Sequence, residues 1–314
     1  MKRLIGNYTG AQHGALIIAI GAMHGNEPAG VQALQTLFQM LENEPLHNPT
    51  FSFKGKIIGL IGNVQAYERK VRYVEKDLNR QFLLENIEKI KKGAPQYFED
   101  EKTNFEDFEL AELLQTIENE ISTYKPKRLI VLDLHTTSAD GGIFTIVAED
   151  AESIAVASEL HAPVVKGFVQ GVGGTTIHYF KTENMGVPTI ALSFEAGQHD
   201  DPLSEKRAIA WLVNALRATD CVQSEDVETR HEEILRGYSD KLPKVVQLIG
   251  SHKITHEDNF KMMPNYKNFQ PVKKGENLAT DKKGYIKAHE DCLILMPLYQ
   301  AQGNDGFFLV KEVM

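Results

Sequence analysis

The sequence is poor in cysteine and in basic charge. Two cysteines in 314 residues are too few for a disulfide framework or a thiolate zinc site, so we expect a reduced, cytoplasmic setting. Lys and Arg number 34 against 43 Asp and Glu, which gives a net charge of −9. This balance disfavours proteins whose main task is to coat nucleic acid or an anionic membrane.

Long apolar runs are also missing. The longest, such as Ala15–Ala22 and Leu129–Leu132, are far too short to span a bilayer. No apolar stretch follows Lys2 and Arg3, so no signal peptide is expected. Apolar residues nevertheless make up 42% of the chain and charged residues 25%, as in an ordinary globular protein.

Strand-like and helix-like segments alternate over the first two thirds of the chain. This alternation predicts an α/β fold with a helix-covered, mostly parallel sheet. The expected strands are 15–21, 56–61, 129–134, 143–147 and 189–194, and the expected helices are 28–42, 104–124, 153–160 and 204–218.

The pattern changes near Pro243. Short β-like segments follow, punctuated by Gly, Pro, Asn and Lys. We therefore expect two domains, a catalytic domain over 1–240 that ends in a charged connector helix at 224–240, and a small β domain over 241–314 that caps the site.

Two polar residues follow the first buried strand directly. His24 and Glu27 lie between that strand and the next helix, where open α/β sheets bind their ligands. Imidazole nitrogen and carboxylate oxygen are zinc ligands, and a catalytic zinc site needs three of them. A surface loop with a Glu near a helix N-terminus is the simpler alternative.

A candidate third ligand closes another apolar strand. His135 ends the run Leu129–Leu134, and Asp133 points to the same face of that strand, where it is placed either to orient the imidazole or to cap the next turn. Together with His24 and Glu27, His135 favours a zinc site at one edge of the sheet.

Glu195 repeats this position at the end of a third apolar strand. An unpaired carboxylate is costly there, so it usually has a function. A fourth ligand, a general base and an exposed strand-end carboxylate are all compatible with the position; three polar residues at three strand ends favour the general base.

One stretch concentrates basic charge in this acidic chain. Within residues 62–82, Arg72, Asn79 and Arg80 are interleaved with apolar residues, which indicates partial burial. Arginine suits carboxylate recognition because its guanidinium is a bidentate fork. A solvated basic face remains the alternative for Arg69 and Lys70.

Four motifs occur in order over about residues 13–220, namely His-Gly-Asn-Glu, Arg-Tyr-x-x-x-Asp-Leu-Asn-Arg-x-Phe, Asp-Leu-His-Thr-Thr and Phe-Glu-Ala-Gly. In this order they resemble the succinylglutamate desuccinylase/aspartoacylase family of zinc carboxypeptidase-like hydrolases. The resemblance implies one zinc ion per chain held by His24, Glu27 and His135, with Glu195 as catalytic base. It also implies that Arg72 polarises the scissile carbonyl and that Asn79 and Arg80 hold a substrate carboxylate.

The chain departs from the family pattern at one point. Aspartoacylases carry an arginine shortly before the strand that leads to the catalytic Glu, whereas residues 179–186 contain no Arg here. Lys181 is the candidate replacement, as a point charge. The family pattern also suggests a pocket tyrosine from the β domain, for which Tyr285 and Tyr299 are the candidates.

The sequence thus predicts a zinc-dependent amidohydrolase of small N-acyl amino acids, of the N-succinyl or N-acetyl type. The alternatives are a metallocarboxypeptidase, whose peptide C-terminus would suit the same carboxylate clamp, and a non-catalytic ligand-binding protein that keeps the pocket. The expected partner is a small molecule, with neither nucleic acid nor membrane, and the chain is compatible with a homo-oligomer. The acyl group and the amino acid are not specified by these residues.

Overall fold

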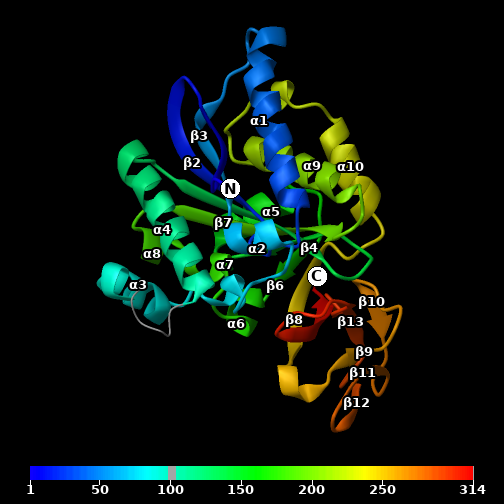
Figure 1. The fold of residues 1–314 in the computed structure, drawn as a ribbon. Helices are drawn as coiled ribbons and strands as arrows, with labels where there is room; N and C mark the ends of the chain where they lie inside the picture. Colours follow the sequence, from blue (N-terminus) through cyan, green and yellow to red (C-terminus); the bar gives the residue numbers. More distant parts are fainter. Residues whose placement is uncertain (98–103, 314) are drawn as a thin grey trace.

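The computed structural model describes residues 1–97 and 104–313, and it is built around one large sheet (Figure 1). The sheet has 11 strands in the order β1-β3-β2-β4-β7-β5-β6-β8-β14-β13-β10. In chain order they are β1 (Leu4–Thr9), β2 (Gln12–Gly21), β3 (Lys54–Ile61), β4 (Leu129–Thr137), β5 (Phe144–Val147), β6 (Val164–Lys166), β7 (Thr189–Gln198), β8 (Val245–Lys253), β10 (Gln270–Val272), β13 (Cys292–Leu295) and β14 (Asp305–Glu312).

Helices connect these strands and cover the sheet. They are α1 (Ala29–His47), α2 (Val64–Arg69), α3 (Leu84–Tyr97), α4 (Phe105–Tyr124), α5 (Ala151–Ser158), α6 (Phe168–Gly171), α7 (Thr176–Tyr179), α8 (Thr182–Met185), α9 (Ser204–Ala218) and α10 (Arg230–Ser239), with 3₁₀ turns η1 (Leu78–Arg80), η2 (Ser224–Asp226) and η3 (His256–Asp258). None of the helices in the described part combines the length and apolar character needed to cross a membrane.

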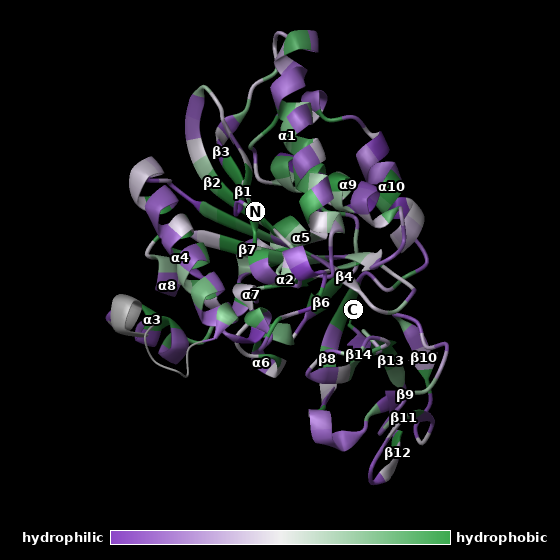
Figure 2. Cartoon of the chain, viewed as in Figure 1, coloured by the Kyte–Doolittle hydropathy of each residue, from purple (hydrophilic) through white to green (hydrophobic). Residues whose placement is uncertain are grey.

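Strands β3, β2, β4 and β7 are parallel neighbours at the centre of the sheet. Their side chains alternate between two cores because successive strand residues point to opposite faces. On β2, Ile17 packs in the core with α1 and α9, while Ile18 packs in the core with α3 and α4. The central strands are accordingly coloured as hydrophobic in Figure 2. The predicted α/β fold with a helix-covered, mostly parallel central sheet is confirmed.

The C-terminal strands continue the same sheet. Strand β8 pairs in parallel with β6, and β14, β13 and β10 then follow outward from β8 in antiparallel pairs. A separate three-stranded sheet contains β9 (Lys261–Met262), β11 (Asn277–Asp281) and β12 (Gly284–Lys287), with an apolar core of its own. Because sheet hydrogen bonding runs on from β6 to β8, the division at residues 240 and 241 stays a prediction.

Individual elements differ from expectation mainly at their ends. Helix α1 runs past the predicted end at Glu42 to His47 and contains Pro45. Helix α4 begins where predicted, since Asn104 and Asp107 form a reciprocal capping box. The connector is only partly helical, because η2 and a separate α10 replace one helix over 224–240. Strands β1 and β6 and helix α3 are absent from the predicted set; α3 is amphipathic and buries Ile87 and Ile90 against the sheet core.

Candidate metal and substrate site

The candidate ligands meet at the carboxyl ends of the parallel strands. Strand β2 ends at Gly21, and the chain turns at Ala22, whose φ is 52°. His24 and Glu27 follow before α1 begins. Gly25 is required in this turn because a Cβ there would lie 2.0 Å from a backbone carbon of Ala66. The local sequence therefore aims both polar side chains at the sheet edge.

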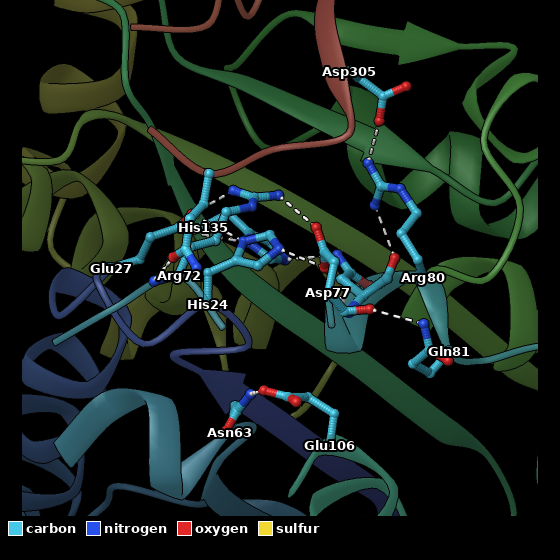
Figure 3. Close-up of polar contacts among 12 residues, drawn as sticks. His24, Glu27, Asn63, Arg72, Asp77, Arg80, Gln81, Glu106, His135 and Asp305 are labelled. Atoms are coloured by element: carbon cyan, nitrogen blue, oxygen red, sulfur yellow. Dashed lines mark hydrogen bonds and ion pairs between the residues drawn. The ribbon is translucent and has the colours of Figure 1, made fainter. Parts of the chain in front are cut away.

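His24, Glu27 and His135 form one buried cluster (Figure 3). Glu27 lies between the imidazoles, with Oε1 2.9 Å from His24 Nδ1 and Oε2 3.1 Å from His135 Nδ1. One ligand atom from each residue lies within 4.8 Å of the other two. The structure thus brings together the three residues for which the sequence predicts a zinc site.

A buried carboxylate lies behind each imidazole. Asp77 Oδ1 lies 3.1 Å from His24 Nε2, and Asp133 Oδ2 lies 2.9 Å from His135 Nε2. When Nε2 of each imidazole donates to its carboxylate, Nδ1 faces Glu27, and loss of the Nδ1 proton would make this nitrogen a metal ligand. Of the two roles considered for Asp133, orientation of the imidazole is the one the geometry supports. Asp77 was missed although it stands inside a recognised motif.

These contacts shift the acidities of the cluster. Burial alone would raise the pKa of Glu27, but His24 and His135 hold it well below its usual range. Burial would lower the pKa of His135, whereas Asp133 and Glu27 raise it well above the ordinary value. For Asp77, burial is outweighed chiefly by Arg72, so its pKa also lies well below the usual range. Glu27 and Asp77 are therefore ionised.

Glu195 lies beside this cluster on β7. It is paired directly with His135 across β4 and β7, and its Oε2 is buried without a hydrogen-bond partner. Burial raises its pKa to about 8, against the opposing effects of His135 and Arg72. A carboxyl with a raised pKa and a free oxygen is suited to accept and return a proton near neutral pH.

Arg72 lies against the same group of carboxylates. Its Nη2 donates to Asp77 at 3.0 Å, and its Nη1 lies 3.7 Å from Glu27. Burial alone would lower the pKa of Arg72, but Asp77 and Glu27 raise it. Arg72 is therefore a fixed positive charge at the edge of the candidate metal cluster.

The loop that leads to Asp77 is held by a buried carboxylate from α4. Glu106 accepts hydrogen bonds from the backbone N–H groups of Val74, Glu75 and Lys76, at 2.7, 3.1 and 3.2 Å. Asn63 also donates to it. These bonds satisfy loop groups that would otherwise be buried without partners, and they fix the position of the following turn.

Asn79 and Arg80 occupy that turn, η1, which Asp77 caps by accepting from the Asn79 N–H. Asn79 Oδ1 accepts from the Thr176 N–H at 3.0 Å, and its Nδ2 lies 3.4 Å from His135 Nε2. Arg80 extends away from the histidines and donates to Asp305 at 2.6 Å (Figure 3). The 3₁₀ turn brings both side chains to one cavity, as two adjacent residues on a strand would not.

A cavity of about 760 Å³, open mouth included, joins these groups. Its lining contains seven of the eight predicted site residues, namely His24, Glu27, Arg72, Asn79, Arg80, His135 and Glu195. Lys181 is not among its lining residues and lies at the start of α8. Neither Tyr285 nor Tyr299 lines it; Tyr285 is 64% exposed on β12, and the Tyr299 hydroxyl donates to the Met263 carbonyl.

Residues 296–305, called the cover segment below, run from the end of β13 to the first residue of β14 and line the cavity. Gln300 Oε1 accepts from Asn26 at 2.8 Å and lies 3.2 Å from His199 Nε2. Gln302 Oε1 accepts from the Arg72 N–H at 3.1 Å. Together with the Arg80–Asp305 pair, these contacts fasten the cover segment to three loops of the site. Nothing near these residues in the sequence indicates this role, since their partners are far away in the chain.

The profile of the succinylglutamate desuccinylase/aspartoacylase catalytic domain matches residues 13–217. Among curated relatives, the chain is 29% identical over 131 residues to a "Probable aspartoacylase" of Nostoc sp., covering 42% of this chain and 38% of that one. It is 30% identical over 153 residues to an N-acyl-aromatic-L-amino acid amidohydrolase (carboxylate-forming) of Xenopus tropicalis, covering 48% and 43%. The matches thus span less than half of these relatives.

The fold also matches solved structures. A succinylglutamate desuccinylase/aspartoacylase from Rhodobacter sphaeroides superposes with a TM-score of 0.63 at 16% identity, covering 97% of this chain and 88% of that one. A succinylglutamate desuccinylase from Vibrio cholerae superposes with a TM-score of 0.61 at 15% identity, covering 95% and 82%. At these identities the likeness concerns the fold.

Proposed function

Because the chain belongs to the succinylglutamate desuccinylase/aspartoacylase family, we propose that it is a zinc-dependent amidohydrolase. Its substrate would be a small N-acyl amino acid, and its products a carboxylate and a free amino acid. One observation carries this proposal. His24 and His135 both direct Nδ1 to Glu27 and Nε2 to a buried carboxylate, beside a Glu195 oxygen that has no partner.

The donor set fits a zinc ion. Two imidazole nitrogens and a carboxylate are a common ligand set of catalytic zinc, and the carboxylates behind the imidazoles orient them. His24, Glu27 and His135 would hold the ion. When bound, zinc would supply Lewis-acid polarisation of a carbonyl and would lower the pKa of a water molecule.

Glu195 would act first as the general base and then as the general acid of the reaction. A water molecule adds to the amide carbon and gives one proton to the Glu195 carboxylate. The same carboxyl then delivers that proton to the leaving nitrogen as the C–N bond breaks, so Glu195 returns to its starting state. Its unpartnered Oε2 and its place in the cavity lining beside His135 support both halves of this transfer.

Two arginines would each bind a different negatively charged group of the substrate, one the oxygen of the reacting carbonyl and the other the carboxylate. Arg72, beside Glu27, would hydrogen-bond the oxygen that gains charge as water adds. Arg80 would hold the carboxylate of the substrate, with Asn79 as a neutral donor next to it. The 3₁₀ turn that places Asn79 and Arg80 on one cavity supports this division.

The cover segment favours a small substrate over a peptide. Gln300, Gln302 and Asp305 fasten it across the site, which narrows the room for a chain that continues beyond the amide bond. A metallocarboxypeptidase remains the alternative reading of the same ligands and carboxylate clamp. The substrate screen below separates the two.

The test combines metal analysis with hydrolysis. Purified protein, dialysed with zinc and then without it, should hold about one zinc ion per chain by elemental analysis. His24→Ala and His135→Ala should hold little, because two protein ligands rarely retain a catalytic ion. His47→Ala is the control, since His47 is exposed on α1 and contacts its own helix.

Release of free amine from N-acetyl and N-succinyl amino acids should require zinc and should be lost after chelation. Release of amino acids from short peptides with blocked N-termini, without activity on N-acyl amino acids, would show a carboxypeptidase. Stoichiometric zinc in both histidine variants would refute the ligand set. Ligand binding without hydrolysis of either class would indicate a non-catalytic protein.

A further inference from the structure

The fixed positive charges of the cavity are already paired within the protein. Arg72 Nη2 lies 3.0 Å from Asp77, and Arg80 Nη2 lies 2.6 Å from Asp305. No lysine of the described residues lines the cavity. Every arginine there thus has a carboxylate partner before any substrate binds.

The pair between Arg80 and Asp305 limits how much negative charge a substrate can bring. Two of the five N–H donors of the guanidinium point to the Asn79 carbonyl and to Asp305, so three remain for a ligand. One substrate carboxylate can use these donors. A second carboxylate on the amino-acid side chain, next to the first, would meet the Asp305 charge and no unpaired cation, which is costly in a largely buried site.

Part of the wall of this cavity is apolar. Ile146, Phe168, Ile177 and Phe308 line it and are each at most 5% exposed. The rings of Phe168 and Phe308 lie 4.8 Å apart, centre to centre. These side chains also belong to one core of the molecule, so the wall is rigid and offers no donor to a charged group.

The apolar wall and the carboxylate clamp share elements of the fold. Asp305 and Phe308 both stand on β14. Asn79 accepts from the backbone of Thr176, which is followed directly by Ile177. A group attached next to the substrate carboxylate would therefore face this wall. In an N-acyl amino acid that group is the amino-acid side chain.

We propose that the substrate is an N-acyl amino acid with an apolar side chain, and that Asp305 discriminates against side chains that carry a second carboxylate. This inference rests on the proposed amidohydrolase function and specifies its substrate class. Asp305 acts by placing a negative charge beside Arg80, while the apolar wall binds the side chain. Specificity then comes from repulsion of one class as well as attraction of another.

The decisive experiment compares N-acetyl-L-leucine and N-acetyl-L-phenylalanine with N-acetyl-L-aspartate. Zinc-loaded wild-type protein should hydrolyse the apolar substrates with kcat/KM at least about a hundredfold higher, since an apolar pocket and a buried charge each contribute one to two powers of ten. Asp305→Asn should reduce this ratio about tenfold through a gain on the aspartate derivative. Phe168→Ala should reduce it through a loss on the apolar substrates.

The control variant is Glu120→Gln, which removes a carboxylate from an ion pair of the same length, 2.6 Å to Lys56, outside the cavity. It should leave the ratio unchanged. If Asp305→Asn improves both substrate classes equally, Asp305 only competes for Arg80 and the proposal is overturned. Equal or better hydrolysis of N-acetyl-L-aspartate by the wild-type protein overturns it without any variant.

A binding measurement separates this inference from the proposed function. Each compound is added to zinc-loaded protein, and the shift in unfolding temperature is recorded. If nothing is hydrolysed, the amidohydrolase proposal fails. The order of the temperature shifts still decides the substrate class: a larger shift with the leucine and phenylalanine derivatives supports it, and a larger shift with the aspartate derivative contradicts it.

Discussion

Asp77 joins His24 to Arg72: one of its oxygens lies 3.1 Å from His24 Nε2, and the other accepts from Arg72 Nη2 at 3.0 Å. A candidate metal ligand and a candidate oxyanion donor thus share one buried carboxylate. A change at Asp77 should therefore act on metal affinity and on chemistry together.

Asp77→Asn keeps the shape of the side chain and removes its charge. We expect zinc affinity to fall about ten- to a hundredfold, the usual effect of losing a partner behind a metal-bound histidine. Competition with a chromophoric chelator measures it. Glu109→Gln is the control, because it removes another buried carboxylate, the partner of Arg3, away from the cavity. Unchanged zinc affinity in Asp77→Asn would show that Asp77 does not support His24.

Glu195→Gln keeps the volume of the side chain and removes the proton acceptor. Zinc content should stay at the wild-type level while kcat falls by about 10²–10⁴, the range for general acid–base catalysis. Elemental analysis and initial rates on the best N-acyl amino acid check both parts. Loss of zinc from this variant would instead make Glu195 a ligand.

The pKa of Glu195, raised to about 8 by burial, predicts a pH-dependent stability in the zinc-free protein. Between its ordinary pKa of 4.5 and about 8, the folded state holds a proton that the unfolded state has lost. Folding therefore becomes less favourable as pH rises through this window, by at most about 1.4 kcal/mol per pH unit.

Glu195→Gln lacks this titration. In chelator-treated samples, the difference in unfolding temperature between Glu195→Gln and wild type should grow in favour of the variant from pH 5 to pH 8. Calorimetry at several pH values gives the comparison. A difference that stays constant across the window would mean that Glu195 is ionised in the folded protein.

Replacing each of the two cavity arginines by lysine should change a different kinetic constant, KM for Arg80 and kcat for Arg72. Arg80→Lys keeps the charge and loses the fork, so KM for an N-acyl amino acid should rise about ten- to a hundredfold, while its carboxamide analogue is hardly affected. Arg72→Lys should lower kcat instead, because its partner gains charge only in the transition state. Equal losses on acid and carboxamide in Arg80→Lys would make Arg80 structural.

The sequence predicts those site residues whose position follows from the strand next to them in the chain. His24 and Glu27 follow β2, and His135 and Glu195 lie near the carboxyl ends of β4 and β7. Because parallel strands end at one edge of a sheet, their meeting point could be predicted. The surrounding motif identifies Asn79 and Arg80 as candidate site residues. It does not predict the 3₁₀ turn that brings both side chains to one cavity.

The partners that complete the site come from far along the chain. Asp305 pairs with a residue 225 positions earlier, and Gln300 with one 274 positions earlier. Neither contact is marked by a local periodicity or motif, because each depends on where the chain after β13 lies relative to the distant loops of the site. The family pattern suggests Lys181 in place of an arginine, but Lys181 precedes α8 and does not line the cavity.

The separation of the cover segment from the ligands sets an order of events during synthesis. His24, Glu27 and His135 have all left the ribosome before β7, and long before residues 296–305 exist. The proposed zinc ion could therefore bind at an open sheet edge, with the covering residues added last. Binding of the metal ion would then precede completion of the pocket that selects the substrate.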